Sequence, residues 1–282
     1  MIKKQGPKIS TLGLSCNEFN YIEKMETLFQ SNAYYLALKR KGSNANGKNE
    51  DYWSPKKDPD GNVRILLGER ENWLKNNVET ISFIQNKIAQ NLGTKNLPKN
   101  LIDIGTGPGW MLEKIYSIHK TNLRYFSLEN SKLGISQQKP YVNNFQNFSS
   151  RLLKHKFDFI IMNHVIEHIK SPVKFFKNII NLLSSKGVIF LGTPDFYSAM
   201  AIRYREKYRM LNEPTHISLF SQDSIFRLLR DHNLKITGVT YPFFESPYFT
   251  KSNLLQILDS KKVSPPFHGN YLLVCAQKSN DF

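Results

Sequence analysis

Short apolar runs alternate with amphipathic segments from Leu101 to the end of the chain, and this order constrains the fold more than any other feature. Runs of this length are typical of buried strands, and the segments between them have helical spacing. Alternation of this kind predicts an α/β fold, a seven-stranded doubly wound sheet with helices on both faces. The predicted strands are Leu101–Ile104, Arg124–Leu128, Tyr141–Asn143, Phe157–Met162, Val188–Gly192, Leu234–Tyr241 and Tyr271–Ala276.

Four segments between these strands are predicted helices. They are Trp110–His119, Lys132–Gln138, Pro172–Leu183 and Asp223–Asn233. Ser171 and Ser221 suit helix starts, because a serine side chain can accept a hydrogen bond from the first helical turn. Lys186-Gly187 suits the end of the third helix, because glycine adopts the backbone conformation that terminates helices.

The first 98 residues contain no repeat and no complete second set of motifs. Two helices are predicted there, Phe19–Leu28 and Glu71–Asn91, on either side of a polar, turn-rich stretch from Gly42 to Asn62.

Two domains are expected from this difference in pattern. Loops and lids shape a substrate pocket while the sheet of such a fold holds the cofactor. We therefore expect residues 1–98 to form a helical N-terminal cap that covers the substrate, and residues 99–282 to form the main domain. Within the main domain, residues 242–269 are rich in Phe, Ser and Pro, have a helical centre near Ser252–Leu258, and are predicted to be a second covering element.

Composition indicates a folded cytoplasmic protein. A chain of 282 residues with 40% hydrophobic content can bury a large core. Its two cysteines, Cys16 and Cys275, suit neither a disulfide framework nor a zinc-knuckle spacing. No apolar stretch approaches the length of a membrane span, and the start of the chain lacks the apolar region of a signal peptide. We expect no membrane span, and no sequence feature sets an oligomeric state.

The formal net charge of +16 raises the question of an anionic partner. The lysines and arginines are spread along the chain rather than clustered, which is typical of a solvated surface and makes nucleic acid an unlikely partner. The charge does suit a small acceptor that carries an anionic group.

A glycine-rich loop follows the first predicted strand of the sheet. Its sequence is Asp103-Ile104-Gly105-Thr106-Gly107-Pro108-Gly109, and a predicted helix begins at the next residue. Glycines permit tight turns and close backbone contact with a ligand, and the helix start directs its amides at negative charge. The spacing is G-x-G-x-G, whereas a dinucleotide site requires G-x-G-x-x-G, so binding of a pyrophosphate is disfavoured.

This loop resembles the first motif of the class I S-adenosylmethionine-dependent methyltransferases, in which alternating glycines follow an acidic residue. The resemblance extends over about residues 100–240. It implies a Rossmann-like fold with S-adenosyl-L-methionine as cofactor, whose methionine part the loop holds while Asp103 organises the loop or receives the ammonium through water. It also implies that Glu129, directly after the second strand, accepts hydrogen bonds from both ribose hydroxyls. Asn143, Asn144 and Phe145 are candidates for contact with the adenine, and the resemblance does not choose among them.

Asn163-His164-Val165-Ile166-Glu167-His168 follows the fourth strand and supports three hypotheses. The letters match the inverted zinc-protease motif, but no third ligand is identifiable. The segment also resembles the ubiquinone-biosynthesis O-methyltransferases and many sugar methyltransferases. The ubiquinone branch has Glu-x-x-Glu-His here and uses it with a divalent metal, which implies metal binding by Glu167 and His168. Because His164 replaces the first glutamate, we prefer the third hypothesis, in which Asn163 and His164 line the cofactor, Glu167 and His168 shape the turn, and no metal binds.

The implied cofactor-binding residues are therefore Asp103, Gly105, Thr106, Gly107, Gly109, Glu129, Asn163 and His164. Methyl transfer depends chiefly on alignment of the nucleophile, and an alcohol acceptor also benefits from a general base. His168 and His216 are the catalytic candidates, since histidine accepts a proton near neutral pH. Aromatic candidates for the acceptor pocket are Tyr34, Tyr35, Trp53, Tyr197, Phe243, Phe244 and Tyr248.

The expected function is transfer of a methyl group to an oxygen or nitrogen atom of a small polar acceptor. A sugar or nucleotide-linked sugar of surface polysaccharide synthesis is the favoured class, by analogy with the sugar branch. The alternatives are a quinone or phenolic acceptor with metal dependence, an RNA acceptor with steep salt dependence, and a protein that binds the cofactor without catalysing a reaction.

Overall fold

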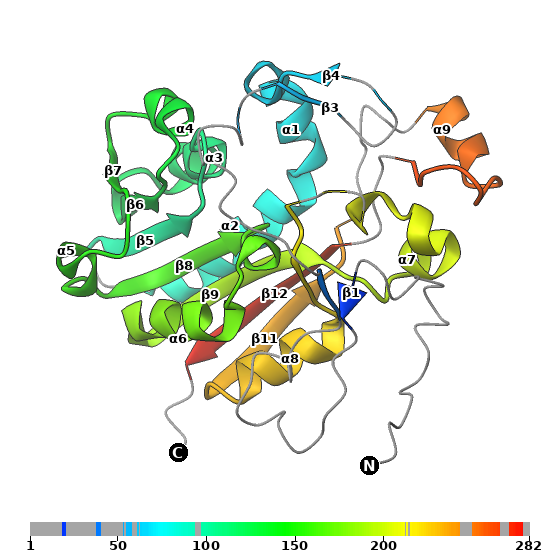
Figure 1. Ribbon diagram of the computed structural model, residues 1–282. Helices are drawn as coiled ribbons and strands as arrows, with labels where there is room; N and C mark the ends of the chain where they lie inside the picture. The colour runs from blue at the N-terminus through cyan, green and yellow to red at the C-terminus, as the bar shows by residue number, and fades with distance from the viewer. Residues whose placement is uncertain are drawn as a thin grey trace, which may run out of the picture.

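The fold is taken from a computed structural model (Figure 1). It describes residues 19–20, 38–40, 53, 55–57, 61, 63–93, 97–211, 213, 215–242, 250–265 and 271–278. For residues 19–20, 38–40, 56–57, 64 and 206 it describes the backbone alone.

A seven-stranded sheet forms the centre of the molecule, in the order β11-β12-β9-β8-β5-β6-β7. Strands β5 to β9 run parallel, and β12 lies antiparallel between β9 and β11. The strands are β5 (Lys99–Ile104), β6 (Leu123–Leu128), β7 (Val142–Phe145), β8 (Phe157–Asn163), β9 (Leu183–Pro194), β11 (Leu234–Thr240) and β12 (Tyr271–Lys278). All seven predicted strands, and the doubly wound sheet, are confirmed.

Helices cover both faces of this sheet (Figure 1). They are α1 (Arg70–Asn76), α2 (Val78–Leu92), α3 (Trp110–His119), α4 (Lys132–Gln137), α5 (Ser150–Leu153), α6 (Pro172–Leu182), α7 (Ala199–Tyr204), α8 (Gln222–Arg230) and α9 (Lys251–Gln256). The four helices predicted between strands are confirmed as α3, α4, α6 and α8. Short strands β1 (Phe19–Asn20), β2 (Leu38–Arg40) and β10 (Ser218–Leu219) form a second sheet, and β3 (Lys56–Lys57) pairs with β4 (Val63–Arg64).

Two predictions at helix boundaries are wrong. Helix α6 ends at Leu182 rather than at Lys186-Gly187, because Leu183 is already extended and begins β9. The single predicted helix Glu71–Asn91 is two helices. Asn77 separates them with φ −113° and ψ 14°, and its amide side chain donates to the carbonyl of Trp73, so it competes with the helical pattern.

The predicted helix Phe19–Leu28 is contradicted at its first two residues, which form strand β1. Its other residues lie outside the described part of the chain.

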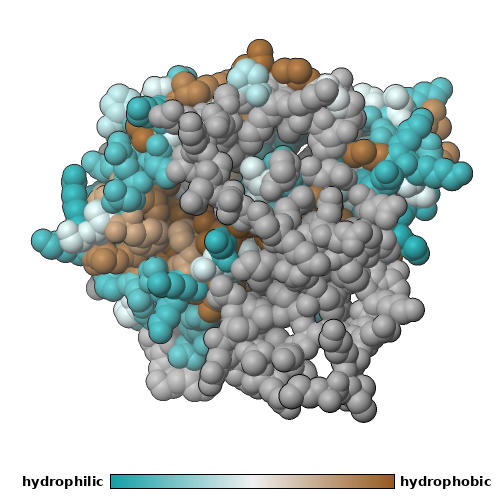
Figure 2. Space-filling view, viewed as in Figure 1, coloured by the Kyte–Doolittle hydropathy of each residue, from teal (hydrophilic) through white to brown (hydrophobic). Residues whose placement is uncertain are grey.

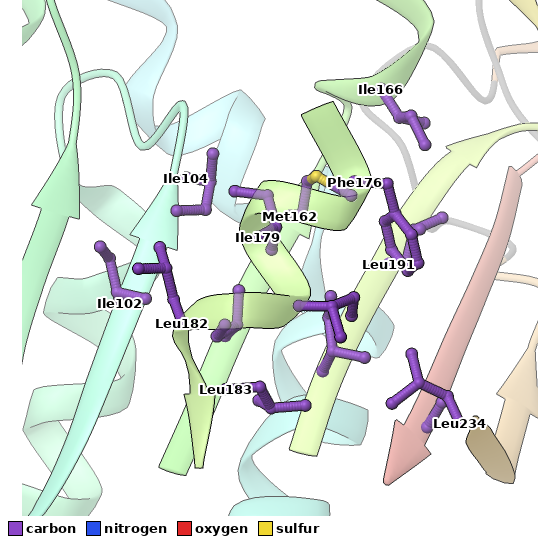
Figure 3. Close-up of a cluster of buried hydrophobic side chains, with 14 of the residues drawn as sticks. Ile102, Ile104, Met162, Ile166, Phe176, Ile179, Leu182, Leu183, Leu191 and Leu234 are labelled. Carbon is purple, nitrogen blue, oxygen red and sulfur yellow. The ribbon is translucent and has the colours of Figure 1, made fainter. Parts of the chain in front are cut away.

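The core has one layer on each side of the sheet. Along β8, successive side chains point to opposite faces: Phe159 and Ile161 pack with α2 and α3, while Ile160 and Met162 pack with α6 and α8. Figure 3 shows Phe176 and Ile179 of α6 among the side chains of β8 and β9. Helix α2 buries Ile81, Ile84 and Ile88 against the opposite face, so it is part of the core of the sheet.

Surface hydropathy varies over the face seen in Figure 2. Hydrophobic side chains gather there over β5, β6 and β8, with hydrophilic side chains above and below them. None of the helices in the described ranges combines the length and apolar character needed to cross a bilayer.

Candidate functional site

The glycine loop joins β5 to α3 at the carboxyl end of the parallel strands. Gly105, Gly107 and Gly109 all have positive φ, at 67°, 55° and 80°. At Gly105 an added Cβ would lie 2.8 Å from a methyl group of Val165, and at Gly107 an added Cβ would lie 2.0 Å from the ring of Trp53. Both conformation and space therefore require glycine at these positions.

Asp103 lies beneath this loop with its side chain buried. One carboxylate oxygen accepts a hydrogen bond from the Thr106 hydroxyl at 2.6 Å. Burial raises the pKa of Asp103 to about 7, and the nearby charge of Glu129 also raises it, although the bond from Thr106 opposes the shift. Asp103 therefore changes its charge close to neutral pH.

Glu129 connects the end of β6 to the glycine loop. Its Oε2 accepts a hydrogen bond from the amide of Gly107 at 2.7 Å, and its Oε1 accepts from the amides of Asn130 and Ser131 at 2.9 and 2.8 Å. A carboxylate offers about four acceptor positions, so these bonds use roughly three of them. The carboxylate holds two loops together and retains room for about one further donor.

A cavity of about 240 Å³ opens between the glycine loop and the segment after β8. Its walls include Asp103, Gly105, Thr106, Glu129, Asn163, His164 and His168. All three tryptophans of the sequence also line it. The ring centroid of Trp110 lies 6.0 Å from that of Trp53 and 5.6 Å from that of Trp73. Both contacts are edge-on, and the three rings form one aromatic wall.

His164 is held in a strained and specific position. Its φ is 55°, which is uncommon for a residue other than glycine, and its amide donates to the carbonyl of Gly192 at 2.9 Å. Its Nδ1 lies 3.1 Å from Oε1 of Glu167. Its ring packs edge-on against that of Tyr271, with ring centroids 4.3 Å apart. Such strain persists only where the surroundings impose it, and it is concentrated at functional sites.

Glu167 is completely buried behind the cavity wall. Its Oε2 accepts a hydrogen bond from the Thr193 hydroxyl at 3.2 Å. Burial by itself would raise the pKa of Glu167, but the hydrogen bond and charge of His164, with the other nearby histidines, outweigh burial and lower it to about 2. The side chain is therefore an ionised carboxylate enclosed by protein.

His168 and His216 lie beside this carboxylate, with ring centroids 4.9 Å apart. Nδ1 of His168 donates to the carbonyl of Thr215 at 3.0 Å, and Nδ1 of His216 donates to the carbonyl of Met210 at 2.8 Å. Burial, together with His168, lowers the pKa of His216 to about 4, so this imidazole is neutral near pH 7. Ligand atoms of Glu167, His168 and His216 all lie within 4.8 Å of one another.

The structure brings most of the candidates to one place. Of the implied cofactor residues, Gly107 and Gly109 shape the loop, and the other six line the cavity. His168 lines the cavity too, whereas His216 lies behind it. Trp53 is in the wall, and Tyr197 is 42% exposed. The other aromatic candidates, Tyr34, Tyr35, Phe243, Phe244 and Tyr248, lie outside the described residues.

Some residues that shape the site were not anticipated from the sequence. Gln138 follows α4 and donates to the carbonyl of Gly107 at 2.9 Å. Asn144 was named only as a candidate for the adenine, and its side chain instead donates to the carbonyl of Glu129 at 3.1 Å. Trp73 and Ser131 line the cavity. A glutamine at the end of a short helix carries no local pattern that would single it out, so only the fold reveals its role.

Comparison with known proteins identifies the family. Residues 77–239, more than half of the chain, match a family model described as a methyltransferase domain. A search of the curated proteins finds no match.

Solved structures share the fold. The plantazolicin methyltransferase BpumL in complex with SAH has a TM-score of 0.52 at 17% identity, over 82% of this chain and 94% of that one. The YcgJ protein from Bacillus subtilis has a TM-score of 0.52 at 11% identity, over 72% of this chain and 99% of that one. The family match and the shared fold agree with the glycine loop and the strand order described above. The chain thus belongs to the methyltransferase domain family, as a class I S-adenosylmethionine-dependent methyltransferase.

Proposed function

We propose that the cavity holds S-adenosylmethionine against the glycine loop and that the methyl group passes to an oxygen or nitrogen atom of a small polar acceptor. One observation supports this most directly: a single cavity joins the glycine loop and Glu129 to His164 and His168. Cofactor groups and acceptor groups on opposite walls of one cavity can align a nucleophile with a methyl carbon, which supplies much of the catalysis in such reactions.

The walls suit the proposed cofactor. The three glycines let its methionine part approach the backbone, and Asp103 offers a carboxylate to its ammonium group. Glu129 has room for about one more hydrogen bond, which a ribose hydroxyl can donate. For Glu129 to bind both hydroxyls, as the resemblance implied, the Gly107 amide would have to share Oε2 with the second one.

On the acceptor side, we propose that His168 contacts the nucleophilic atom and that His216 supports it from behind. This assignment keeps both catalytic candidates and follows their positions, because His168 lines the cavity and His216 is buried next to it. Asn163 and His164 complete the wall between cofactor and acceptor.

A sugar or nucleotide-linked sugar of surface polysaccharide synthesis remains the proposed acceptor. The formal charge of +16 favours an acceptor with an anionic group such as a nucleoside diphosphate. We further propose that residues 1–98 help to cover it, since Trp53 and Trp73 from this region lie in the wall. A cytoplasmic location is part of the proposal and is supported by Cys275, a buried free thiol.

Binding and turnover can be tested separately. Calorimetry should show one S-adenosylmethionine bound per chain. A panel of nucleotide sugars, free sugars, phenols and short RNAs can then be scanned for release of S-adenosylhomocysteine. Turnover with a nucleotide sugar would support the proposed acceptor, and turnover confined to phenols or RNA would refute it. Tight cofactor binding with no turnover of any acceptor would favour the non-catalytic alternative.

A further inference from the structure

We infer that His164 is the general base of the reaction, that Glu167 positions it, and that the acceptor atom is the oxygen of a hydroxyl group. This inference rests on the proposed function and narrows it from an oxygen or nitrogen atom to oxygen. A neutral amine already has the lone pair that attacks, whereas a hydroxyl is a weak nucleophile until a base removes its proton. A dedicated base next to the acceptor space therefore suits a hydroxyl.

The carboxylate of Glu167 sets the position of the proton on His164. Nδ1 of His164 lies 3.1 Å from Oε1 of Glu167, which is an ionised carboxylate enclosed by protein. An ionised carboxylate can only accept, so the proton of the neutral ring is on Nδ1 and the lone pair is on Nε2. The side chain of His164 lines the cavity and is 30% exposed. Because Nδ1 is bonded to Glu167, Nε2 is the ring nitrogen that can serve an acceptor in the cavity.

The ring of His164 is fixed before any acceptor arrives. Its backbone has a φ of 55°, and its amide donates to the carbonyl of Gly192 at 2.9 Å. The ring of Tyr271 packs edge-on against it, and the Thr193 hydroxyl orients the carboxylate of Glu167 from the other side. A base held in place in this way does not have to be ordered during the reaction, which lowers the entropic part of the barrier.

His164 also lies next to the proposed cofactor site. Strands β5 and β8 are parallel neighbours, so the glycine loop after β5 and His164 after β8 emerge at the same edge of the sheet. The two segments are in close contact, since an added Cβ at Gly105 would lie 2.8 Å from a methyl group of Val165, the next residue after His164. A hydroxyl in this part of the cavity can face both the methyl donor and Nε2.

His168 lines the same cavity but has a different support. Nδ1 of His168 donates to the carbonyl of Thr215, whereas Nδ1 of His164 donates to a carboxylate. A full negative charge stabilises the imidazolium that forms when a base takes a proton, and it does so more strongly than a carbonyl dipole. We therefore assign the proton to His164 and keep for His168 the contact with the nucleophilic atom.

The proton of the acceptor hydroxyl passes to His164 during the transfer. S-adenosylmethionine supplies the methyl carbon, whose bond to sulfur breaks with the electron pair going to sulfur. The acceptor oxygen bonds to this carbon and loses its proton to Nε2 of His164. The positive charge of the sulfonium is thus replaced by that of the imidazolium, beside the negative charge of Glu167. The ring then releases its proton to water.

The position of the ring proton can be tested without any acceptor. Nuclear magnetic resonance of the ¹⁵N-labelled chain with S-adenosylhomocysteine, at mildly alkaline pH, distinguishes the two neutral forms of a histidine ring. The signal of His164 is the one lost in His164→Asn, and we expect it to show the proton on Nδ1. In Glu167→Gln the side-chain amide can donate as well as accept, so the share of this form should fall. A parent chain with the proton on Nε2 of His164 would overturn the inference.

Turnover then tests the base. His164→Asn removes the ring and keeps the backbone, because asparagine tolerates positive φ better than most residues. With S-adenosylmethionine and the hydroxyl compound that the acceptor panel identifies, kcat should fall by ~100- to 10,000-fold, the usual contribution of a general base. Affinity for S-adenosylhomocysteine should stay close to that of the parent chain, which separates loss of the base from loss of the cofactor site.

Chemical rescue separates a base from a structural role. His164→Gly leaves space for a ring, so imidazole in the buffer should restore part of the lost turnover. Lys120→Gly is the matched control, because Lys120 also has a positive φ, 41°, but is not among the residues of the cavity wall. This control should keep the kcat of the parent chain and show no response to imidazole.

The outcomes distinguish this inference from the proposed function. Parent-like turnover in His164→Asn, or no rescue of a His164→Gly chain that binds S-adenosylhomocysteine normally, would overturn the base alone. Methylation confined to amines would overturn the hydroxyl. A parent chain that methylates nothing in the panel would overturn the proposed function and this inference together. Should Glu167→Gln fail to fold, the variants of the more exposed His164 still decide.

Discussion

The glycine side of the cavity and its histidine side are held by different kinds of bond. On the glycine side, backbone amides converge on Glu129, and positive φ angles bring the chain close to its neighbours. On the histidine side, side chains bond to one another and to backbone carbonyls, and the partners are 3 to 47 residues apart in sequence. The first arrangement fixes a shape, while the second fixes protons and charges. Substitutions should therefore act on the two sides in different ways.

Gly107→Ala should have the largest effect on the glycine side. The new Cβ would lie 2.0 Å from the ring of Trp53, so either the loop or the ring must move. We expect affinity for S-adenosylhomocysteine to fall by ~100-fold, equivalent to about 3 kcal/mol. Isothermal titration calorimetry measures the change.

Gly93→Ala separates backbone strain from this steric clash. Gly93 also has a positive φ, 70°, but an added Cβ would meet nothing within 4 Å. The control should lose about 1 kcal/mol of folding stability from strain and keep its affinity for the ligand. Equal losses of affinity in the two variants would refute the steric explanation.

Glu129→Gln tests the carboxylate that joins the two loops. The neutral amide keeps the shape, but its NH2 group cannot accept, so the backbone amides that bond to one of the two carboxylate oxygens lose their partner and the remaining bonds lose the charge. Hydrogen bonds to charged groups contribute about 1.5–3 kcal/mol. We expect affinity for S-adenosylhomocysteine to fall by ~10- to 30-fold in calorimetry. Glu113→Gln alters only an ion pair with Arg70 near the surface and should leave affinity unchanged. A similar loss in both would indicate a general effect of charge.

The charge of Asp103 should make cofactor binding depend on pH. Its pKa is about 7, and S-adenosylmethionine is cationic at its sulfonium and ammonium groups. Protonation removes the attraction, so the association constant should fall as pH drops below 7, approaching tenfold per unit. Calorimetry between pH 5.5 and 8 measures the slope of the logarithm of the association constant against pH. In Asp103→Asn the slope should vanish, and a slope that persists would assign the dependence to the histidine side.

Ser221→Ala should have the smallest effect and act only on folding. The Ser221 side chain caps α8 by accepting from the amide of Ser224, in a reciprocal capping box. Its loss should cost about 1 kcal/mol in thermal or urea unfolding and leave ligand affinity intact. Ser171→Ala is the matched control, since Ser171 precedes α6 without a capping hydrogen bond. Equal destabilisation of the two variants would contradict the capping role.

The sequence was most informative where local pattern determines structure. Strands β5, β6, β8, β9 and β12 were predictable because buried apolar runs dominate their segments. The glycine loop was predictable because its positive φ angles favour glycine. Two helix boundaries were predicted wrongly because of local features. At Asn77 a side chain bonds to the backbone and interrupts the helix, and at Leu183 a strand begins directly after the helix. The contact of His216 with His168 was not predictable, because it depends on how a later loop crosses the end of the sheet.

The aromatic wall gives the protein an optical property. Trp53, Trp73 and Trp110 are all the tryptophans in the chain, and each lines the cavity. Indole emission excited at the red edge of the absorption band therefore originates only at this site, without background from the rest of the fold. Binding of the cofactor and binding of an acceptor can each be followed in the unlabelled protein, in real time and at low concentration.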